Sequence, residues 1–376
     1  MKTNFVLMAL AIYRKYRPKL LSDLIGQEIV SDVLKNAAKT DKLSHAYLFY
    51  GPRGTGKTTA ARLLAKIANC QTRQEDSDFR KEGEPCNKCR PCLEIDEGRA
   101  LDVVELDAAS NRGIDEIRNL KEGIRLSPTS YKYKVFIIDE AHQLTKAAFD
   151  ALLKTLEEPP EHAIFILATT EADKLPNTIT SRTQRFHFRR VPIQSVLEKL
   201  EKIVKEEKIK IDKNALDLIA SSSEGSFRDA ESLLEQVISM GVNMTLEAVE
   251  QVLGKVGFER TNTLTKYLIE QDLKAALDYL AQISESGFNL VQLTKDLIHF
   301  FRRILAYKFN PALEKYFSRE MTDDELSEIK KHAESIKDVD KVINLTKSLI
   351  KAYSQMRYSP FTAIPLEIAI IENLKD

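Results

Sequence analysis

A glycine-rich octapeptide, Gly51-Pro-Arg-Gly-Thr-Gly-Lys57-Thr58, restricts the fold of this chain more than any other segment. It matches the phosphate-binding P-loop pattern G-x-x-x-x-G-K-[ST]. The context also fits, because the apolar run 45–50 predicts a buried strand before the loop and 60–68 predicts a helix after it. Glycines let the backbone wrap closely around phosphate, and N–H groups at a helix N-terminus attract the anion. The alternative is an ordinary glycine turn.

The loop predicts a site for ATP and Mg²⁺. The expected nucleotide-binding residues are Gly51, Pro52, Arg53, Gly54, Thr55, Gly56, Lys57, Thr58 and Thr59. Lys57 is predicted to reach the β- and γ-phosphates, and Thr58 is predicted to coordinate Mg²⁺.

An acidic pair follows another apolar strand. The run Val135-Phe-Ile-Ile ends in Asp139 and Glu140, which is the Walker B arrangement. We expect Asp139 to help hold Mg²⁺ and Glu140 to orient the attacking water. A solvated helix cap is the alternative interpretation of this pair. His142, just beyond it, is interpreted as structural.

Strand-length apolar runs alternate with helical patterns up to about Arg190. Strands are predicted at 45–50, 101–106, 134–138, 163–168 and 185–189. Such an alternation indicates a parallel α/β sheet with helices on both faces. Helical periodicity then dominates to the C-terminus. Helices are predicted at 193–209, 215–221 and 227–240, with a further helical block from about 258 to 376.

All four cysteines lie in one segment with the spacing C-x15-C-x2-C-x2-C: Cys70, Cys86, Cys89 and Cys92. Four thiolates at such spacing suit one tetrahedral Zn²⁺. Since no ligand position would stay open, we expect a structural metal, with free or redox-active thiols as the alternative. The charged stretch 71–84 is expected to be a surface excursion.

Composition argues against two broad classes. The 56 basic and 56 acidic residues balance, which argues against a bulk polycation but leaves room for a local basic groove. No run approaches the roughly 18 apolar residues of a membrane span. The apolar run 5–12 resembles a signal-peptide core, but no small-residue cleavage site follows it, and Met8 is an alternative start. We expect a cytoplasmic protein without membrane contact.

Four further segments contain short motifs: Tyr16-Arg17-Pro18 with Ile25-Gly26-Gln27, the strand His45-Ala-Tyr-Leu-Phe, Ser181-Arg182-Thr183, and Gly225-Ser-Phe-Arg228-Asp-Ala. Together with the P-loop and the acidic pair, they resemble the clamp-loader subunits of the AAA+ ATPases, and among them the gamma/tau subunits of bacterial DNA polymerase III. The resemblance covers nearly the whole chain and is weakest beyond about residue 255. Thr183 is a departure, since the family usually has Cys there.

The resemblance implies roles for single residues. Tyr16, Arg17 and Pro18 match the adenine-contacting segment, and Thr170 matches the sensor 1 position. Arg182 matches the arginine finger, which enters the ATP site of a neighbouring subunit. Arg228 matches the sensor 2 arginine of the helical lid. Guanidinium groups suit this work, because phosphoryl transfer needs charge stabilisation. The full catalytic set is then Lys57, Asp139, Glu140, Thr170, Arg182 and Arg228.

The resemblance also implies the domain order and the function. The implied domains are an AAA+ ATP-binding domain (1–190) with a zinc module at about 70–98, a helical lid (191–255) and a helical oligomerisation collar (256–376). The implied function is that of an ATPase motor subunit in the DNA polymerase III holoenzyme, which loads the ring-shaped sliding clamp onto primed DNA. The implied partners are other clamp-loader subunits, the clamp, primer-template DNA and the replicative polymerase.

Several expectations stay open. The chain is expected in a hetero-oligomer, or alone in a homo-oligomer, and near the nucleoid. The end at Asp376 favours a short, gamma-like form over a longer tau-like one. Arg112 and Arg118 are candidates for DNA contact, with a solvated helix face as an equal alternative. Phe300 and Phe301 could stack on bases, but their helical spacing favours core positions.

Three other functions compete with clamp loading. A different AAA+ machine, such as a Holliday-junction motor, is disfavoured by the zinc module and by the Ser181-Arg182 pair. A non-hydrolysing structural arm is disfavoured by the intact P-loop and acidic pair. A nucleotide-gated zinc scaffold would bind partners without turnover, so a measurement of ATP hydrolysis would distinguish it.

Overall fold

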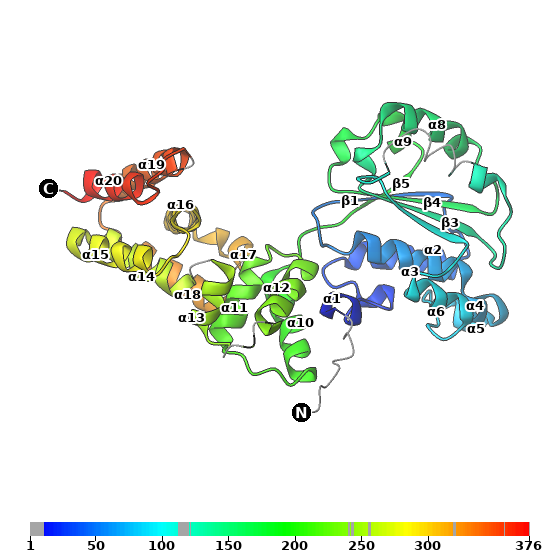
Figure 1. The fold of residues 1–376 in the computed structure, drawn as a ribbon, viewed down its shortest axis with the longest axis horizontal. Helices are drawn as coiled ribbons and strands as arrows, with labels where there is room; N and C mark the ends of the chain where they lie inside the picture. The colour runs from blue at the N-terminus through cyan, green and yellow to red at the C-terminus, as the bar shows by residue number, and fades with distance from the viewer. Residues whose placement is uncertain are drawn as a thin grey trace, which may run out of the picture. The chain divides into compact units, whose positions relative to one another are not determined.

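The computed structural model describes residues 11–111, 120, 122–239, 241, 244–254, 257–318, 321–356 and 358–375 (Figure 1). The chain divides into two compact units. The first contains Met1–Val191 and Ser226–Arg228, and the second contains Pro192–Gly225 and Asp229–Asp376. Arg112 and Arg118, the candidates for DNA contact, lie outside the described residues.

Five parallel strands form the centre of the first unit, in the order β2-β3-β4-β1-β5. The bounds are β1 Ala46–Tyr50, β2 Val103–Asp107, β3 Lys134–Asp139, β4 Ala163–Thr169 and β5 Gln184–His187. All five predicted strands are therefore confirmed, with small shifts at their ends. The parallel α/β fold class is confirmed as well.

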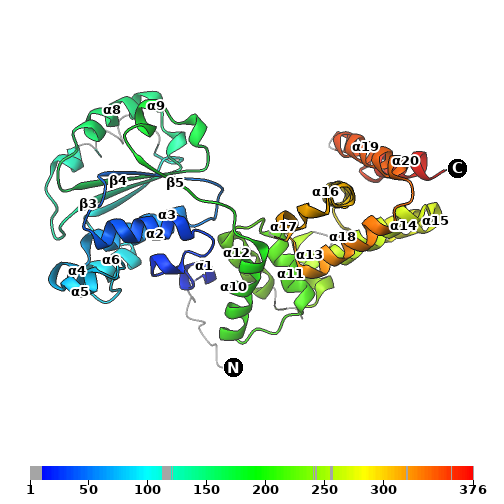
Figure 2. The ribbon, with the colours of Figure 1, turned by 180° about the vertical axis from the view of Figure 1, so that it is seen from behind.

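Helices cover both faces of this sheet (Figures 1 and 2). Their bounds are α1 Ile12–Lys15, α2 Glu28–Lys39, α3 Lys57–Asn69, α4 Gln71–Glu75, α5 Ser77–Arg80, α6 Arg90–Glu97, α8 Lys146–Glu157 and α9 Asn177–Thr180, with short 3-10 turns η1 Leu21–Asp23, η2 Ala141–Gln143 and η3 Ala172–Lys174. One buried core joins the sheet to α2, α3 and α6, and the other joins it to α8 and α9.

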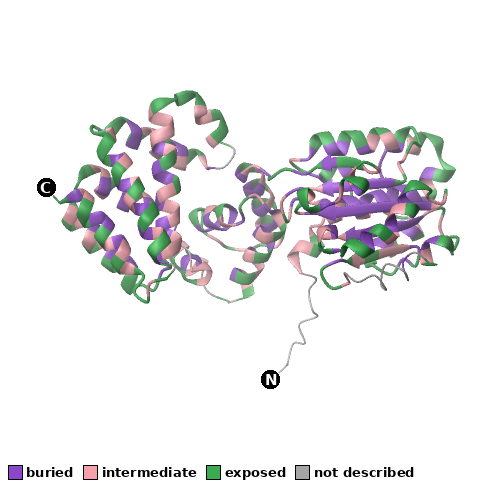
Figure 3. Cartoon of the chain, turned by 90° about the horizontal axis from the view of Figure 1, so that it is seen from above, coloured by how far each residue is buried: buried purple, intermediate pink, exposed green. Residues whose placement is uncertain are grey.

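The central strands are buried along their length (Figure 3). Strands covered on both faces lose the alternation of apolar and polar residues, which explains the continuous apolar runs in the sequence. On one face, the rings of Phe136 and Phe165 stack with centroids 5.4 Å apart. The order β3-β4-β1 places the carboxyl ends of these three strands side by side. The loops that follow them therefore meet at one edge of the sheet.

The second unit is helical. Its elements are α10 Ile193–Glu206, α11 Lys213–Ser222, α12 Phe227–Ser239, α13 Leu246–Leu253, α14 Phe258–Glu270, α15 Leu273–Glu285, α16 Leu290–Phe309, η4 Pro311–Leu313, α17 Glu314–Phe317, α18 Asp323–Ser335, α19 Val339–Met356 and α20 Ala363–Leu374. Phe300 and Phe301 lie in its core, as their spacing predicted. Among the described helices, none combines the length and the apolar character that crossing a membrane requires.

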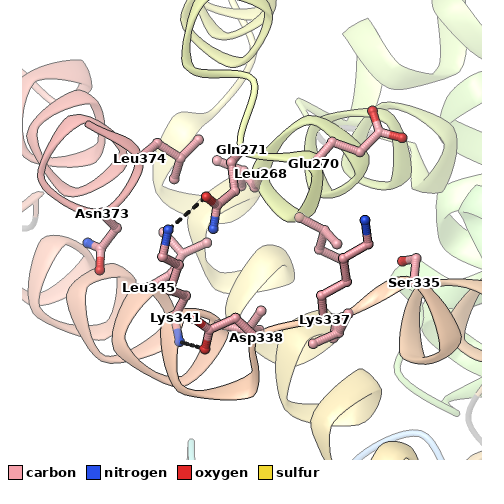
Figure 4. Close-up of a pocket in the computed structure, with 13 residues that line it drawn as sticks. Leu268, Glu270, Gln271, Ser335, Lys337, Asp338, Lys341, Leu345, Asn373 and Leu374 are labelled. Atoms are coloured by element: carbon pink, nitrogen blue, oxygen red, sulfur yellow. Dashed lines mark hydrogen bonds between the residues drawn. The ribbon is translucent and has the colours of Figure 1, made fainter. Parts of the chain in front are cut away.

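A cavity of about 570 Å³ opens between α14, α19 and α20 in the second unit (Figure 4). Leu268, Leu345 and Leu374 contribute apolar walls, and Lys341 Nζ donates a hydrogen bond to Gln271 Oε1 at 2.9 Å. The residues that line it include none of the predicted site residues. This cavity is thus separate from the predicted chemistry.

Candidate nucleotide and metal sites

The P-loop backbone has a conformation that requires glycine. Gly51 has φ of +141°, and a Cβ built on it would stand 2.0 Å from the carbonyl oxygen of Phe188. Gly56 has φ of +101° directly before α3. The helix begins at Lys57, three residues earlier than predicted, so Lys57 and Thr58 lie in its first turn. N–H groups there lack helical partners and can point at an anion.

Lys57 is held over its own loop. Its Nζ donates hydrogen bonds to the carbonyl oxygens of Gly51 at 2.8 Å and Pro52 at 2.7 Å. Burial lowers the pKa of this ammonium group, and the carboxylates of Glu140 and Asp139 act in the opposite direction. These two contacts hold the ammonium group against the loop that is predicted to bind phosphate.

Thr58 and Asp139 meet at the edge of the sheet. Thr58 Oγ1 donates a hydrogen bond to Asp139 Oδ2 at 2.7 Å, from the first turn of α3 to the last residue of β3. A hydroxyl and a carboxylate oxygen are ligands that Mg²⁺ prefers. The two predicted magnesium ligands therefore form one cluster beside Lys57, and this chemistry fits a Mg²⁺ ion bound with nucleotide phosphates.

Glu140 has a strained backbone and a fixed side chain. Its φ is +47°, a left-handed conformation that is uncommon for a residue other than glycine. Thr170 donates from Oγ1 to Glu140 Oε2 at 3.0 Å, and its backbone N–H lies 3.4 Å from the same oxygen. Strain of this kind often marks functional sites. The sensor 1 candidate is thus in contact with the predicted catalytic carboxylate.

His142 belongs to the same cluster. Its side chain is 5% exposed, and Nδ1 lies 2.9 Å from Thr169 Oγ1 and 3.4 Å from Glu140 Oε2. Nε2 lies 3.3 Å from Glu171 Oε1. The structural interpretation of His142 overlooked this contact with Glu140. Its position two residues after the acidic pair was the available signal.

The N-terminal segment brings arginines together near α3. Burial lowers the pKa of Arg17, and the positive charges of Arg62 and Arg228 lower it further. Arg62, on α3, forms an ion pair of 2.6 Å with Glu105. Arg228 Cζ lies 5.3 Å from the centre of the Tyr13 ring, within the first unit. Sequence reasoning missed Arg62, whose only signal was its place on the helix after the P-loop.

Arg182 follows α9 in the chain, and its side chain contacts residues of α8 and α9. Its Nη2 forms an ion pair of 2.5 Å with Glu157 on α8, and its Nη1 donates to the carbonyl of Thr178 at 2.8 Å. The side chain is 34% exposed. An ion pair this exposed contributes little stability, so the guanidinium can exchange partners at low cost. Thr183, the departure from the family pattern, bonds the carbonyls of Ile179 and Thr180.

The four cysteine sulfurs form one cluster. The Sγ atoms of Cys70, Cys86, Cys89 and Cys92 all lie within 4.8 Å of one another. A tetrahedral site with Zn–S bonds of about 2.3 Å has sulfurs about 3.8 Å apart. The backbone N–H groups of Lys88 and Cys89 point at Cys86 Sγ, at 3.4 and 3.2 Å. This arrangement fits a tetrahedral metal.

The stretch 71–84 is more than the surface excursion that was expected. It forms α4 and α5, and Arg73 and Glu84 within it are 4% and 6% exposed. The Arg73 guanidinium donates to the carbonyl oxygens of Ile67 and Ala38, which lie near the ends of α3 and α2. The high charge of this stretch predicts solvent exposure, but the side chains of Arg73 and Glu84 form hydrogen bonds with buried residues.

Three family models match consecutive parts of this chain. The model of the DNA polymerase III delta subunit matches residues 26–192. The model of the ATPase lid domain of the DNA polymerase III clamp loader subunit matches residues 195–243. The model of domain III of the DNA polymerase III gamma and tau subunits matches residues 244–375.

Curated relatives agree with these models. The tau subunit of DNA polymerase III from Bacillus subtilis (strain 168) is 40% identical, over 96% of this chain and 62% of the relative. The tau subunit from Escherichia coli (strain K12) is 38% identical, over 80% of this chain and 46% of the relative. The gamma subunit from Buchnera aphidicola subsp. Schizaphis graminum is 35% identical, over 96% of this chain and 97% of the relative. The chain thus spans about half to three fifths of these tau subunits.

Proposed function

This chain belongs to the gamma and tau subunit family of DNA polymerase III, and from that premise we propose that it is an ATPase motor subunit of a clamp loader. The observation that carries the ATPase part is the contact between Thr58 and Asp139 at 2.7 Å, with Lys57 and Glu140 beside it. These are the groups that bind, neutralise and orient a nucleoside triphosphate.

Each residue has a proposed task. The P-loop backbone and Lys57 bind the phosphates, and Thr58 and Asp139 hold Mg²⁺, which neutralises charge on the phosphate oxygens. Glu140 orients and polarises the attacking water. Thr170 holds the Glu140 carboxylate in place, as its 3.0 Å hydrogen bond supports.

Two arginines are proposed to complete each nucleotide site, one from the same chain and one from a neighbouring subunit. Arg228, close to Arg17 of the N-terminal segment, is proposed to contact the nucleotide in the same subunit, with Tyr16, Arg17 and Pro18 at the adenine. Arg182 is proposed to act on a neighbouring subunit's nucleotide. Its side chain contacts Glu157 on α8 and Thr178 on α9, which supports a role at a nucleotide site other than the one in its own chain.

The four cysteines are proposed to hold one structural Zn²⁺, which their mutual distances support. The proposed partners are other clamp-loader subunits, a sliding clamp, primed DNA and the replicative polymerase, in a nucleoid-associated assembly. The domain limits 190/191 and 255/256 and the collar role of the last domain belong to the same proposal. ATP binding would organise the assembly around an open clamp, and hydrolysis would release the clamp on DNA.

The test is ATP hydrolysis by this chain assembled with clamp-loader partners. Clamp together with primed DNA is expected to stimulate the rate strongly, and the Lys57→Ala variant in the same assembly serves as the inactive control. A rate that responds to neither clamp nor DNA would move the chain to another class of AAA+ machine. Binding of nucleotide without any turnover would instead favour a nucleotide-gated scaffold.

A further inference from the structure

A buried carboxylate of the cysteine module holds the N-terminal segment. Glu84, two residues before Cys86, is 6% exposed. Its Oε2 accepts the backbone N–H of Leu21 at 2.7 Å, and its Oε1 accepts that of Ser22 at 2.9 Å. Lys35 Nζ, from α2, lies 3.0 Å from Oε1. One charged side chain therefore satisfies two backbone donors that are distant in the sequence.

A second contact comes from the other side of Cys86. Asn87 Nδ2 donates a hydrogen bond to the carbonyl of Lys19 at 3.1 Å. Asn87 has φ of +58°, a left-handed conformation that asparagine adopts more readily than most residues. It lies in the turn whose N–H groups point at Cys86 Sγ. Ligation of a metal by Cys86 and Cys89 would fix this turn, and with it the direction of Asn87.

The segment held in this way contacts the nucleotide loop. A Cβ on Gly56 would lie 3.6 Å from Leu24 Cδ2, so Leu24 packs on the last glycine of the P-loop. Ser31, on α2, donates to the Leu21 carbonyl at 2.7 Å and fixes the other side of the segment. Upstream, the same segment leads to Arg17, which lies near Arg62 of α3.

We propose that the cysteine module is a positioning element for nucleotide binding, in which Glu84 and Asn87 hold residues 19–24 against the P-loop when the metal is bound. This inference rests on the nucleotide and metal sites of the proposed function. The physical reason is that the backbone N–H of the fully buried Leu21 depends on this carboxylate, and an unpaired buried donor is costly. The N–H of Ser22 binds the same carboxylate from a partly buried position. Without Glu84 the segment would move toward water, and its contact with Gly56 would loosen.

The experiment compares Glu84→Ala and Glu84→Gln with Glu82→Ala in the full chain. Glu82 is exposed and lies two residues upstream, so it is a matched control. Three quantities are measured: the Kd for ATP, the zinc content, and hydrogen–deuterium exchange of a peptide covering residues 19–24. We expect Glu84→Ala to raise the Kd about tenfold and to speed exchange, with zinc retained. Glu84→Gln keeps one acceptor oxygen, so its effects are expected to be smaller, and Glu82→Ala is expected to change nothing.

Metal removal tests the other half of the inference. Wild-type chain stripped of zinc by a chelator is expected to show the same faster exchange at residues 19–24. Unchanged Kd and exchange in both Glu84 variants would overturn the inference, as would unchanged exchange in the stripped protein. If Glu84→Ala does not fold, Glu84→Gln decides alone. Normal ATP binding by Lys57→Ala would instead overturn the nucleotide site itself, so the two failures can be told apart.

Discussion

The hydroxyl of Thr170 donates a hydrogen bond to the carboxylate of Glu140, with Oγ1 and Oε2 3.0 Å apart. The contact joins the residue after β4 to the residue after β3. Thr170→Val keeps the shape of the side chain and removes the donor. We expect kcat for ATP hydrolysis to fall about tenfold, because Glu140 loses a fixed orientation toward the attacking water, with little change in the Kd for ATP.

The control for this variant is Thr263→Val, because the Thr263 hydroxyl donates to a helix carbonyl in the second unit. Steady-state hydrolysis and nucleotide titration measure the two quantities. A rise in Kd with unchanged kcat would contradict the role of Thr170 in holding Glu140 and would point to contact with the nucleotide instead.

The sequence predicted the sheet and the P-loop because both depend on local patterns. Continuous apolar runs mark strands buried on both faces. Gly51 is required because its backbone leaves no room for a Cβ, and Gly56 is favoured because its φ is positive. The predicted helix starts too late because Lys57 and Thr58 are polar, whereas α3 begins at Lys57, directly after Gly56.

Contacts between distant segments could not be predicted in the same way. Glu84 and Leu21 are far apart in the sequence, and the charged composition around Glu84 suggested solvent exposure. The sequence alone favours a structural interpretation of His142, because it does not show that the end of β4 brings Thr169 and Glu171 to the imidazole ring. Such pairs depend on strand order, which residue patterns do not encode directly.

Lys57→Ala tests the P-loop assignment. Lys57 Nζ is buried beside the loop carbonyls, where a bound phosphate would take its charge-assisted hydrogen bonds. We expect the Kd for ATP to rise by about a hundredfold, from the loss of two such bonds. Lys42→Ala, an exposed lysine before β1, is the control. Unchanged affinity in Lys57→Ala, measured by titration with a fluorescent ATP analogue, would refute the assignment.

Arg182→Ala tests the trans role of this arginine. We expect nucleotide binding to stay near wild type, while hydrolysis in the assembly falls on the order of a thousandfold, the usual contribution of an arginine finger. Glu157→Gln removes the present partner of Arg182 and is the control, for which no loss of turnover is expected. Assemblies that mix Arg182→Ala with wild-type subunits and still hydrolyse at the full rate would rule the finger out.

The buried position of His332 predicts that the stability of the second unit depends on pH. Burial lowers its pKa despite the nearby carboxylates of Glu328 and Glu270, and its Nε2 lies 2.6 Å from Asn262 Oδ1. As the pH falls, the imidazole of His332 therefore gains a proton at about pH 6.5 in the unfolded chain, and only at a lower pH in the folded chain. The stability that this group contributes is complete above that value and is lost as pH falls toward the lowered folded pKa.

The comparison for His332 is a pair of thermal unfolding curves at about pH 7.5 and pH 5.5, chosen on either side of the reference pKa. The drop in Tm on acidification is expected to be smaller in His332→Gln, which keeps a donor for Asn262 but does not titrate. Equal drops in the two proteins would mean that other groups set the acid response.

Metal analysis tests the cysteine cluster directly. Protein purified without chelator is expected to hold about one zinc per chain, because four sulfurs lie within 4.8 Å of one another. Cys89→Ser, which alters a half-buried ligand, is expected to lose most of that zinc and to lower Tm. Ser77→Ala, at the start of α5, is the control. Absence of zinc from protein purified without chelator would show that the four thiols pack together without a metal.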